Sequence, residues 1–260
     1  MKGRVRYRRD TTAAGSLGEV TVLLIPGFWL DASSWAPVVA ALESNGHDAI
    51  AVTLPGMASK DEDRTAIGLR DHVEAVVRLI DQVDGPVVLV GHSAGGAVAY
   101  ASVDERPDRV SRVIYVDALP LGPGECVNAD LPEAAGEIPL PDWSLFDPPD
   151  LVDLDDEARA RFRERAIPVP VGAARDLQVL HDARRHDVPA TVICCEFTSH
   201  QLKEWVLQGE PGTAELAAIA DVTYVDLATG HWPQFTRPDE LAEIVVAVVA
   251  AVGVHEGPRD

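Results

Sequence analysis

One short segment constrains the fold of this chain more than any other. Residues 87–90 (V-V-L-V) are apolar and mostly β-branched, which is typical of a buried strand. The sequence G-H-S-A-G (91–95) follows directly, and helix-like spacing begins after it. A Gly-x-Ser-x-Gly between a strand and a helix predicts a sharp turn that holds the Ser93 hydroxyl clear of the strand end. The same turn places the Ala94 amide at a helix N-terminus, where it can stabilise a developing negative charge.

Strands and helices alternate along the rest of the chain. Segments with apolar residues at helical spacing, such as 71–83, separate short apolar runs. These runs, which predict strands, lie at 20–25, 47–54, 110–116, 190–197 and 222–227. Nearly continuous apolar strands of this kind specify a mostly parallel sheet that is covered on both faces. We therefore predict an α/β fold with a doubly wound, mostly parallel sheet.

The regular alternation breaks down between residues 121 and 188. This stretch is rich in prolines and has short segments near 155–166 and 173–184 that fit helices. It also carries Trp143 and Phe146 close together, which is not typical of a solvated linker. We expect one α/β core, made of residues 1–120 and 189–260, with residues 121–188 inserted as a helical cap.

Ser93 needs a base, because a serine hydroxyl is a weak nucleophile near neutral pH. His231 directly follows the last predicted strand, so a parallel sheet would place it at the same edge as Ser93. His92 adjoins Ser93, but its side chain should point away from the hydroxyl and serve packing or orientation. We predict that His231 is the general base.

Three motifs, each at the end of a predicted strand, carry a family resemblance. They are Pro26-Gly27, G-H-S-A-G-G (91–96) and Gly230-His231. Their order resembles the α/β-hydrolase fold family, and the likeness covers roughly residues 21–252, being weakest in the expected cap. The first half of the chain is similar to the small esterase and hydroxynitrile-lyase branch of that family.

The resemblance implies a fold and a chemistry. It implies acyl transfer by a serine, an acid and a histidine, through an acyl-enzyme on Ser93 and without a metal or an organic cofactor. It also implies an oxyanion hole formed by the backbone N–H groups of Phe28 and Ala94. The usual His-Gly before this loop is Pro26-Gly27 here, which leaves the backbone amides in place.

The acid of the triad has more than one candidate. Most relatives place it a few residues after the strand at 190–197, where this chain has F-T-S-H (197–200). Asp117 is favoured, because it closes the strand next to that of Ser93 and some branches of the family supply the acid from this position. Glu196 is the alternative, and a site without either acid is the third reading. Asp226 is too close in sequence to His231 to be chosen.

Aromatic residues near the motifs indicate the character of the substrate pocket. Together with Phe28, the predicted substrate contacts are Trp29, Trp143, Phe146 and Trp232. Apolar and aromatic walls favour a small hydrophobic ester or lactone over a sugar or a charged peptide. We expect a serine hydrolase of the carboxylesterase or lactonase type.

Two other functions compete with hydrolysis. A hydroxynitrile-type lyase would use the same triad as a base, but it would need a basic side chain in the pocket, and Lys203 is the only lysine in the C-terminal half of the chain. A non-catalytic ligand receptor on the same fold is kept open by the missing usual acid.

Charge and cysteine content bound the partners and the compartment. The formal net charge of −20 disfavours nucleic acid and anionic membrane surfaces. Basic residues crowd positions 2–9, but no apolar run of a targeting signal follows them. Three cysteines, without metal-binding spacing, indicate a reducing compartment, so we expect a cytoplasmic protein. A homodimer is compatible with the sequence.

Overall fold

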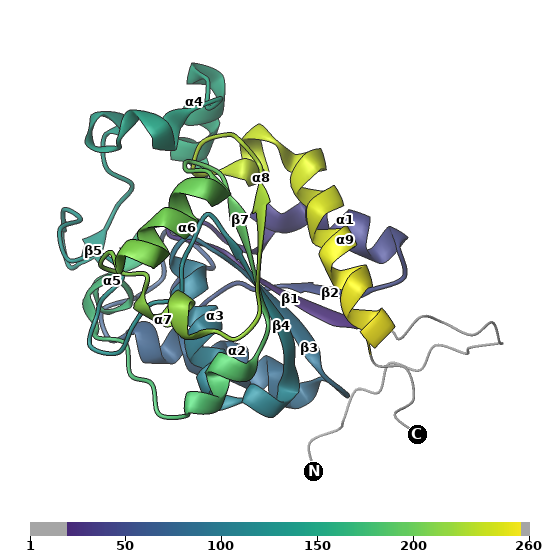
Figure 1. Ribbon diagram of the computed structural model, residues 1–260. Helices are drawn as coiled ribbons and strands as arrows, with labels where there is room; N and C mark the ends of the chain where they lie inside the picture. Colours follow the sequence, from purple (N-terminus) through teal and green to yellow (C-terminus); the bar gives the residue numbers. More distant parts are fainter. Residues whose placement is uncertain (1–19, 256–260) are drawn as a thin grey trace, which may run out of the picture.

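A computed structural model describes residues 20–255 and contains one large sheet (Figure 1). All of its neighbouring strands are parallel, in the order β2-β1-β3-β4-β7-β8. The strands are β1 (Thr21–Ile25), β2 (Asp48–Ala51), β3 (Val87–His92), β4 (Val110–Val116), β7 (Ala190–Cys194) and β8 (Val222–Asp226). The predicted doubly wound parallel sheet is confirmed. The strand order reverses between β1 and β3, and ligands of open α/β sheets bind at such a point.

Helices cover both faces of this sheet (Figure 1). On β3, Val88 and Val90 pack toward one face, and Val87 and Leu89 pack toward the other, as the alternation of a strand requires. The first face is covered by α1 (Ala36–Ser44) and α9 (Pro238–His255). The second is covered by α2 (Leu69–Gln82), α3 (Ala94–Glu105), α6 (Ser199–Gln208) and α7 (Ala214–Ala218). Both faces of the central strands β1, β3 and β7 are therefore buried, which is why these strands are almost wholly apolar.

The chain between β4 and β7 adds no strand to the large sheet. It forms α4 (Asp156–Arg165), α5 (Val171–Arg175), the short pair β5 (Glu137–Ile138) and β6 (Val169–Pro170), and the 3₁₀ turns η3 (Trp143–Leu145), η4 (Pro148–Leu151) and η5 (Ala183–Asp187). The helix expected at 173–184 is wrong, because the chain leaves the helix at Asp176. Gln178 instead pairs its backbone with Gly124 and Glu125.

None of the helices within residues 20–255 combines the length and the apolar character needed to cross a bilayer. The basic residues at positions 2–9 lie outside the described residues. The long apolar stretch 244–252 is part of α9, where it packs against the sheet.

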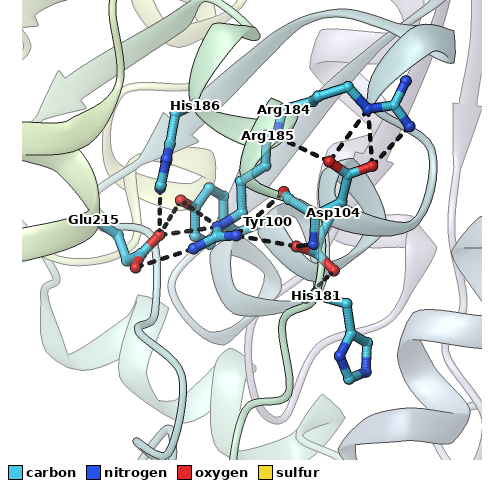
Figure 2. Close-up of polar contacts among 8 residues, drawn as sticks. Tyr100, Asp104, His181, Arg184, Arg185, His186 and Glu215 are labelled. Atoms are coloured by element: carbon cyan, nitrogen blue, oxygen red, sulfur yellow. Dashed lines mark hydrogen bonds and ion pairs between the residues drawn. The ribbon is translucent and has the colours of Figure 1, made fainter.

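A buried ion network joins α3 to η5 and α7 (Figure 2). The Arg185 guanidinium lies 3.0 Å from Glu215, 3.3 Å from Asp104 and 3.1 Å from the Tyr100 hydroxyl. Asp104 also accepts the backbone amides of His181 and the next residue. The network therefore ties the chain leaving the insertion to the helix that follows Ser93.

The carboxyl of Glu215 is held ionised by this network. Burial alone would raise the pKa of Glu215, but hydrogen bonds from Arg185, Tyr100 and His186 lower it to about 2. A carboxyl whose pKa is lower in the folded chain stabilises the fold above its unfolded pKa, and that stabilisation is lost as the pH falls toward the folded value.

We expect Glu215→Gln to reduce the free energy of unfolding at pH 7 by roughly 2–3 kcal/mol, because it leaves Arg185 short of a charged partner. Urea unfolding followed by circular dichroism measures the loss. The difference from the parent chain should shrink between pH 4.5 and about 2, where Glu215 takes up its proton. Glu210→Gln removes an exposed charge nearby and is the control; a loss of equal size in that variant would contradict the assignment.

Candidate active site

Ser93 stands on a tight turn between β3 and α3. Its backbone has φ 51° and ψ −125°, a conformation that costs a non-glycine residue about 1–3 kcal/mol. A Cβ on Gly91 would lie 2.6 Å from the Gly95 carbonyl oxygen, and a Cβ on Gly95 would lie 2.4 Å from that of Ile25. Only glycine fits at these two positions, so the motif lets α3 begin directly against the sheet.

His231 meets Ser93 at the carboxyl ends of the strands. The Ser93 hydroxyl donates to His231 Nε2 at 2.7 Å. Two hydrogen bonds fix the backbone of His231. Its backbone N–H donates to the Asp150 carbonyl at 2.9 Å, and its backbone carbonyl accepts from His92 Nε2 at 2.6 Å. The two side chains predicted to form the nucleophile–base pair therefore lie within hydrogen-bond reach.

Both candidate acids lie beside the other ring nitrogen of this histidine. His231 Nδ1 donates to Asp117 Oδ2 at 2.7 Å, and Glu196 Oε1 lies 2.8 Å from the same nitrogen. Asp117 is the more deeply buried of the two, with 1% of its side chain exposed against 21% for Glu196. Its second oxygen accepts the amides of Cys195 and Glu196, which fixes the Asp117 carboxylate in place.

Charge within this group shifts three pKa values. Burial works to lower the pKa of His231, but the hydrogen bond to Asp117 and the carboxyl of Glu196 beside the same nitrogen raise it well above its ordinary value. Burial works to raise the pKa of Asp117, yet the His231 hydrogen bond holds it below its usual range. Burial and the charge of Asp117 raise the pKa of Glu196 to about 7, against the opposing effect of His231. Asp117 is thus the ionised partner at neutral pH.

His92, for which the sequence predicts a packing or orienting role, contacts the backbone of the His231 loop. It is fully buried, which lowers its pKa to about 3 and keeps the ring neutral. Its Nε2–H donates to the His231 carbonyl, as described above, and so helps to hold the backbone of His231 in position. Sequence patterns alone could not show that contact, because the two residues lie 139 positions apart in the chain.

A cavity of about 500 Å³ opens above Ser93 and His231. Trp29 and Phe146 line it, as predicted, together with Phe28. Trp143 and Trp232 do not line it, and the structure corrects that expectation. Trp232 is only 1% exposed, and the two indoles pack edge to face with centroids 5.9 Å apart, behind Phe146. They support the wall of the cavity and do not form its surface.

Carboxylates form much of the polar surface of this cavity. Asp130, Asp147, Asp150 and Glu196 line it, and no lysine or arginine does so among the described residues. The first three make no ion pair within residues 20–255. Sequence reasoning did not single them out, although acidic residues are dense between 130 and 156. The cavity is therefore lined by aromatic side chains and by several carboxyl groups, without a basic side chain from the described lysines and arginines.

One group in this part of the chain has the composition of a cation site. Ligand atoms of Asp117, Glu196 and His231 lie within 4.8 Å of one another. His231 Nδ1 already donates its proton to Asp117 there, so a metal ion would have to displace the proton that orients the ring. The geometry fits a hydrogen-bonded triad better than a metal centre.

Comparison with known proteins points to one family. A family model described as the alpha/beta hydrolase family matches residues 22–244. Lipase LipV of Mycobacterium tuberculosis is 39% identical over 67% of this chain and 73% of its own length. Probable hydrolase R7 of a Phoma species is 24% identical over 86% of this chain and 96% of its own. A solved structure of the methylesterase MES16 from Arabidopsis shares the fold, with TM-score 0.67, 18% identity, and coverage of 89% of this chain and 99% of that one.

We expect the rate at which a fluorophosphonate probe labels Ser93 to rise with pH, with a midpoint above 6.5. The carboxylates at Nδ1 raise the pKa of His231, and only the neutral imidazole can accept the Ser93 proton. Labelling rates measured between pH 5 and 10 give the midpoint. A midpoint at or below 6.5 would contradict the arrangement.

Proposed function

This chain belongs to the alpha/beta hydrolase family, and we propose that it is a serine hydrolase that cleaves a hydrophobic carboxylic ester or lactone. The observation that carries the proposal is the continuous chain of hydrogen bonds from Ser93 through His231 to Asp117, with both contacts at 2.7 Å. Ser93 and His231 also line a cavity that has aromatic walls. The names of two relatives, a lipase and a probable hydrolase, support the same reaction class.

The proposed reaction begins with proton transfer from Ser93 to His231 Nε2, while Ser93 Oγ attacks the substrate carbonyl. The amides of Phe28 and Ala94 are proposed to bind the resulting oxyanion, since Phe28 lines the cavity and Ala94 opens α3. His231 then gives its proton to the leaving alcohol, which departs and leaves an acyl-enzyme. Water attacks that ester with His231 as base, and the acid is released as Ser93 regains its proton.

The lining of the cavity supports a substrate without negative charge. Phe28, Trp29 and Phe146 offer apolar contact to an acyl or alcohol group. The carboxylates in the lining repel an anion, and they favour release of the product acid once it ionises.

Geometry argues against the two competing functions. The lysine that a lyase would use, Lys203, lies over the ring of Tyr224 at 4.9 Å from its centroid and does not line the cavity. A receptor that had lost its acid would leave His231 Nδ1 without a carboxylate, whereas Asp117 accepts from it here. Hydrolysis needs the triad but no basic side chain in the cavity, and it is therefore the function that these residues support best.

We expect Ser93→Ala to lower kcat for a p-nitrophenyl ester by about 10⁶-fold, because the acyl-enzyme can no longer form. The change removes the hydroxyl and keeps a Cβ at the same positive φ, so the melting temperature should not fall. Ester hydrolysis by purified protein, with circular dichroism as the folding control, measures both. Persistent hydrolysis in the variant would exclude Ser93 as the nucleophile.

We expect p-nitrophenyl hexanoate to be hydrolysed with a kcat/KM at least about tenfold higher than mono-p-nitrophenyl adipate, whose acyl chain ends in a carboxylate. The gap should narrow with added salt, which screens the cavity charges. It should also narrow in Asp130→Asn, which removes one of them. Equal values for the two esters at low ionic strength would show that the acidic lining does not select substrates.

A further inference from the structure

Glu196 has a feature that a single Ser–His–Asp chain does not explain. Its Oε1 lies 2.8 Å from His231 Nδ1, yet the angle is not that of a hydrogen bond. The same oxygen is buried and has no other hydrogen-bond partner. A buried carboxylate oxygen without a hydrogen bond lowers the stability of the fold, so the position of this oxygen needs an explanation.

Chemistry at Nδ1 limits what the two carboxyls can do together. An imidazole carries one proton on Nδ1, and in the structure that proton goes to Asp117. Asp117 is fixed by two backbone amides, those of Cys195 and Glu196. Within the described residues no backbone amide donates to the buried Glu196 Oε1, and this oxygen already lies beside the ring.

We propose that Glu196 is a second positioning residue for His231, a carboxyl that stabilises the protonated ring alongside Asp117 and can hold Nδ1–H when Asp117 cannot. The inference rests on the proposed function, because it concerns the base of that reaction. The positive charge that His231 gains from Ser93 would then lie between two carboxyls. Glu196 reaches this place from just beyond a different strand, β7, and its backbone amide also donates to Asp117.

Several other groups face this pair and belong in any account of its pH dependence. The titratable groups around His231 and Glu196 are Asp117 at the end of β4, His92 at the end of β3, Asp150 and Asp147 of the η4 turn, and the thiol of Cys195. Burial raises the pKa of the Cys195 thiol, and burial holds the His92 ring neutral. The carboxyls are therefore the groups that set the charge near the base.

The direct test measures the pKa of His231 without catalysis. In Ser93→Ala protein, the imidazole signal of His231, assigned by its loss in His231→Gln, is titrated by NMR. Glu196→Gln should lower the pKa of His231 by about one unit, because one nearby negative charge is removed. Asp130→Asn removes a charge from the same cavity without touching the ring, and it should leave that pKa close to the parent value. Equal shifts in the two variants would overturn the proposal.

A second test asks whether Glu196 can replace Asp117. Asparagine tolerates the positive φ of 45° at this position and keeps an oxygen for the two amides, so Asp117→Asn should fold. Fluorophosphonate labelling should slow by about 10⁴-fold in Asp117→Asn/Glu196→Gln, as when a triad histidine loses its acid. Asp117→Asn alone should slow it far less, on the order of 10²-fold, since Glu196 still accepts from Nδ1.

The outcomes separate the two levels of the claim. If Asp117→Asn is as slow as the double variant, Glu196 does not take over. If Glu196→Gln alone is as slow, Glu196 is the sole acid and the shared arrangement is wrong. A parent chain that neither labels nor hydrolyses esters overturns the proposed function, while the NMR titration still decides whether Glu196 acts on His231.

Discussion

Close contact between the start of α3 and the sheet is the constraint on which the site depends. The backbones of β1, β3 and α3 meet there without room for a single Cβ at Gly91 or Gly95. That contact holds Ser93 at a positive φ which the residue would not adopt alone. Packing of the whole sheet, with both faces buried, offsets the local cost. Stability of the core and the exposure of one hydroxyl are therefore linked.

Parallel strand order brings the remaining groups to the same edge. The four neighbouring strands β3, β4, β7 and β8 each lead into one part of the site. In that order, the chain beyond them carries Ser93, Asp117, Glu196 and the His231 loop. Because all four strands point the same way, no long excursion of the chain is needed to collect these side chains. The insertion leaves after β4 and returns before β7, so it roofs the cavity while the edge below it stays intact.

Much of this arrangement could be predicted from the sequence, for identifiable reasons. Buried parallel strands are continuously apolar, and a glycine-flanked serine between strand and helix has few structural alternatives, so Ser93 and His231 could be expected at one edge. The sequence favours Asp117 and keeps Glu196 as the alternative acid, because both follow adjacent strands, and the structure places both at Nδ1. The packing of Trp143 against Trp232 could not be predicted, since aromatic content does not show which rings face a cavity and which face each other.

The bonds between the η4 segment and the histidine loop have a consequence for how such enzymes diversify. The amides of Gly230 and His231 donate to the carbonyls of Val152 and Asp150, and a Cβ on Gly230 would collide with both. Residues 150–152 thus hold the His231 loop in position, and Asp150 also lines the cavity. Relatives can therefore exchange most of the insertion and so change the residues above the cavity. The segment that takes the place of residues 150–152 must, however, keep a backbone that accepts the two amides of the histidine loop.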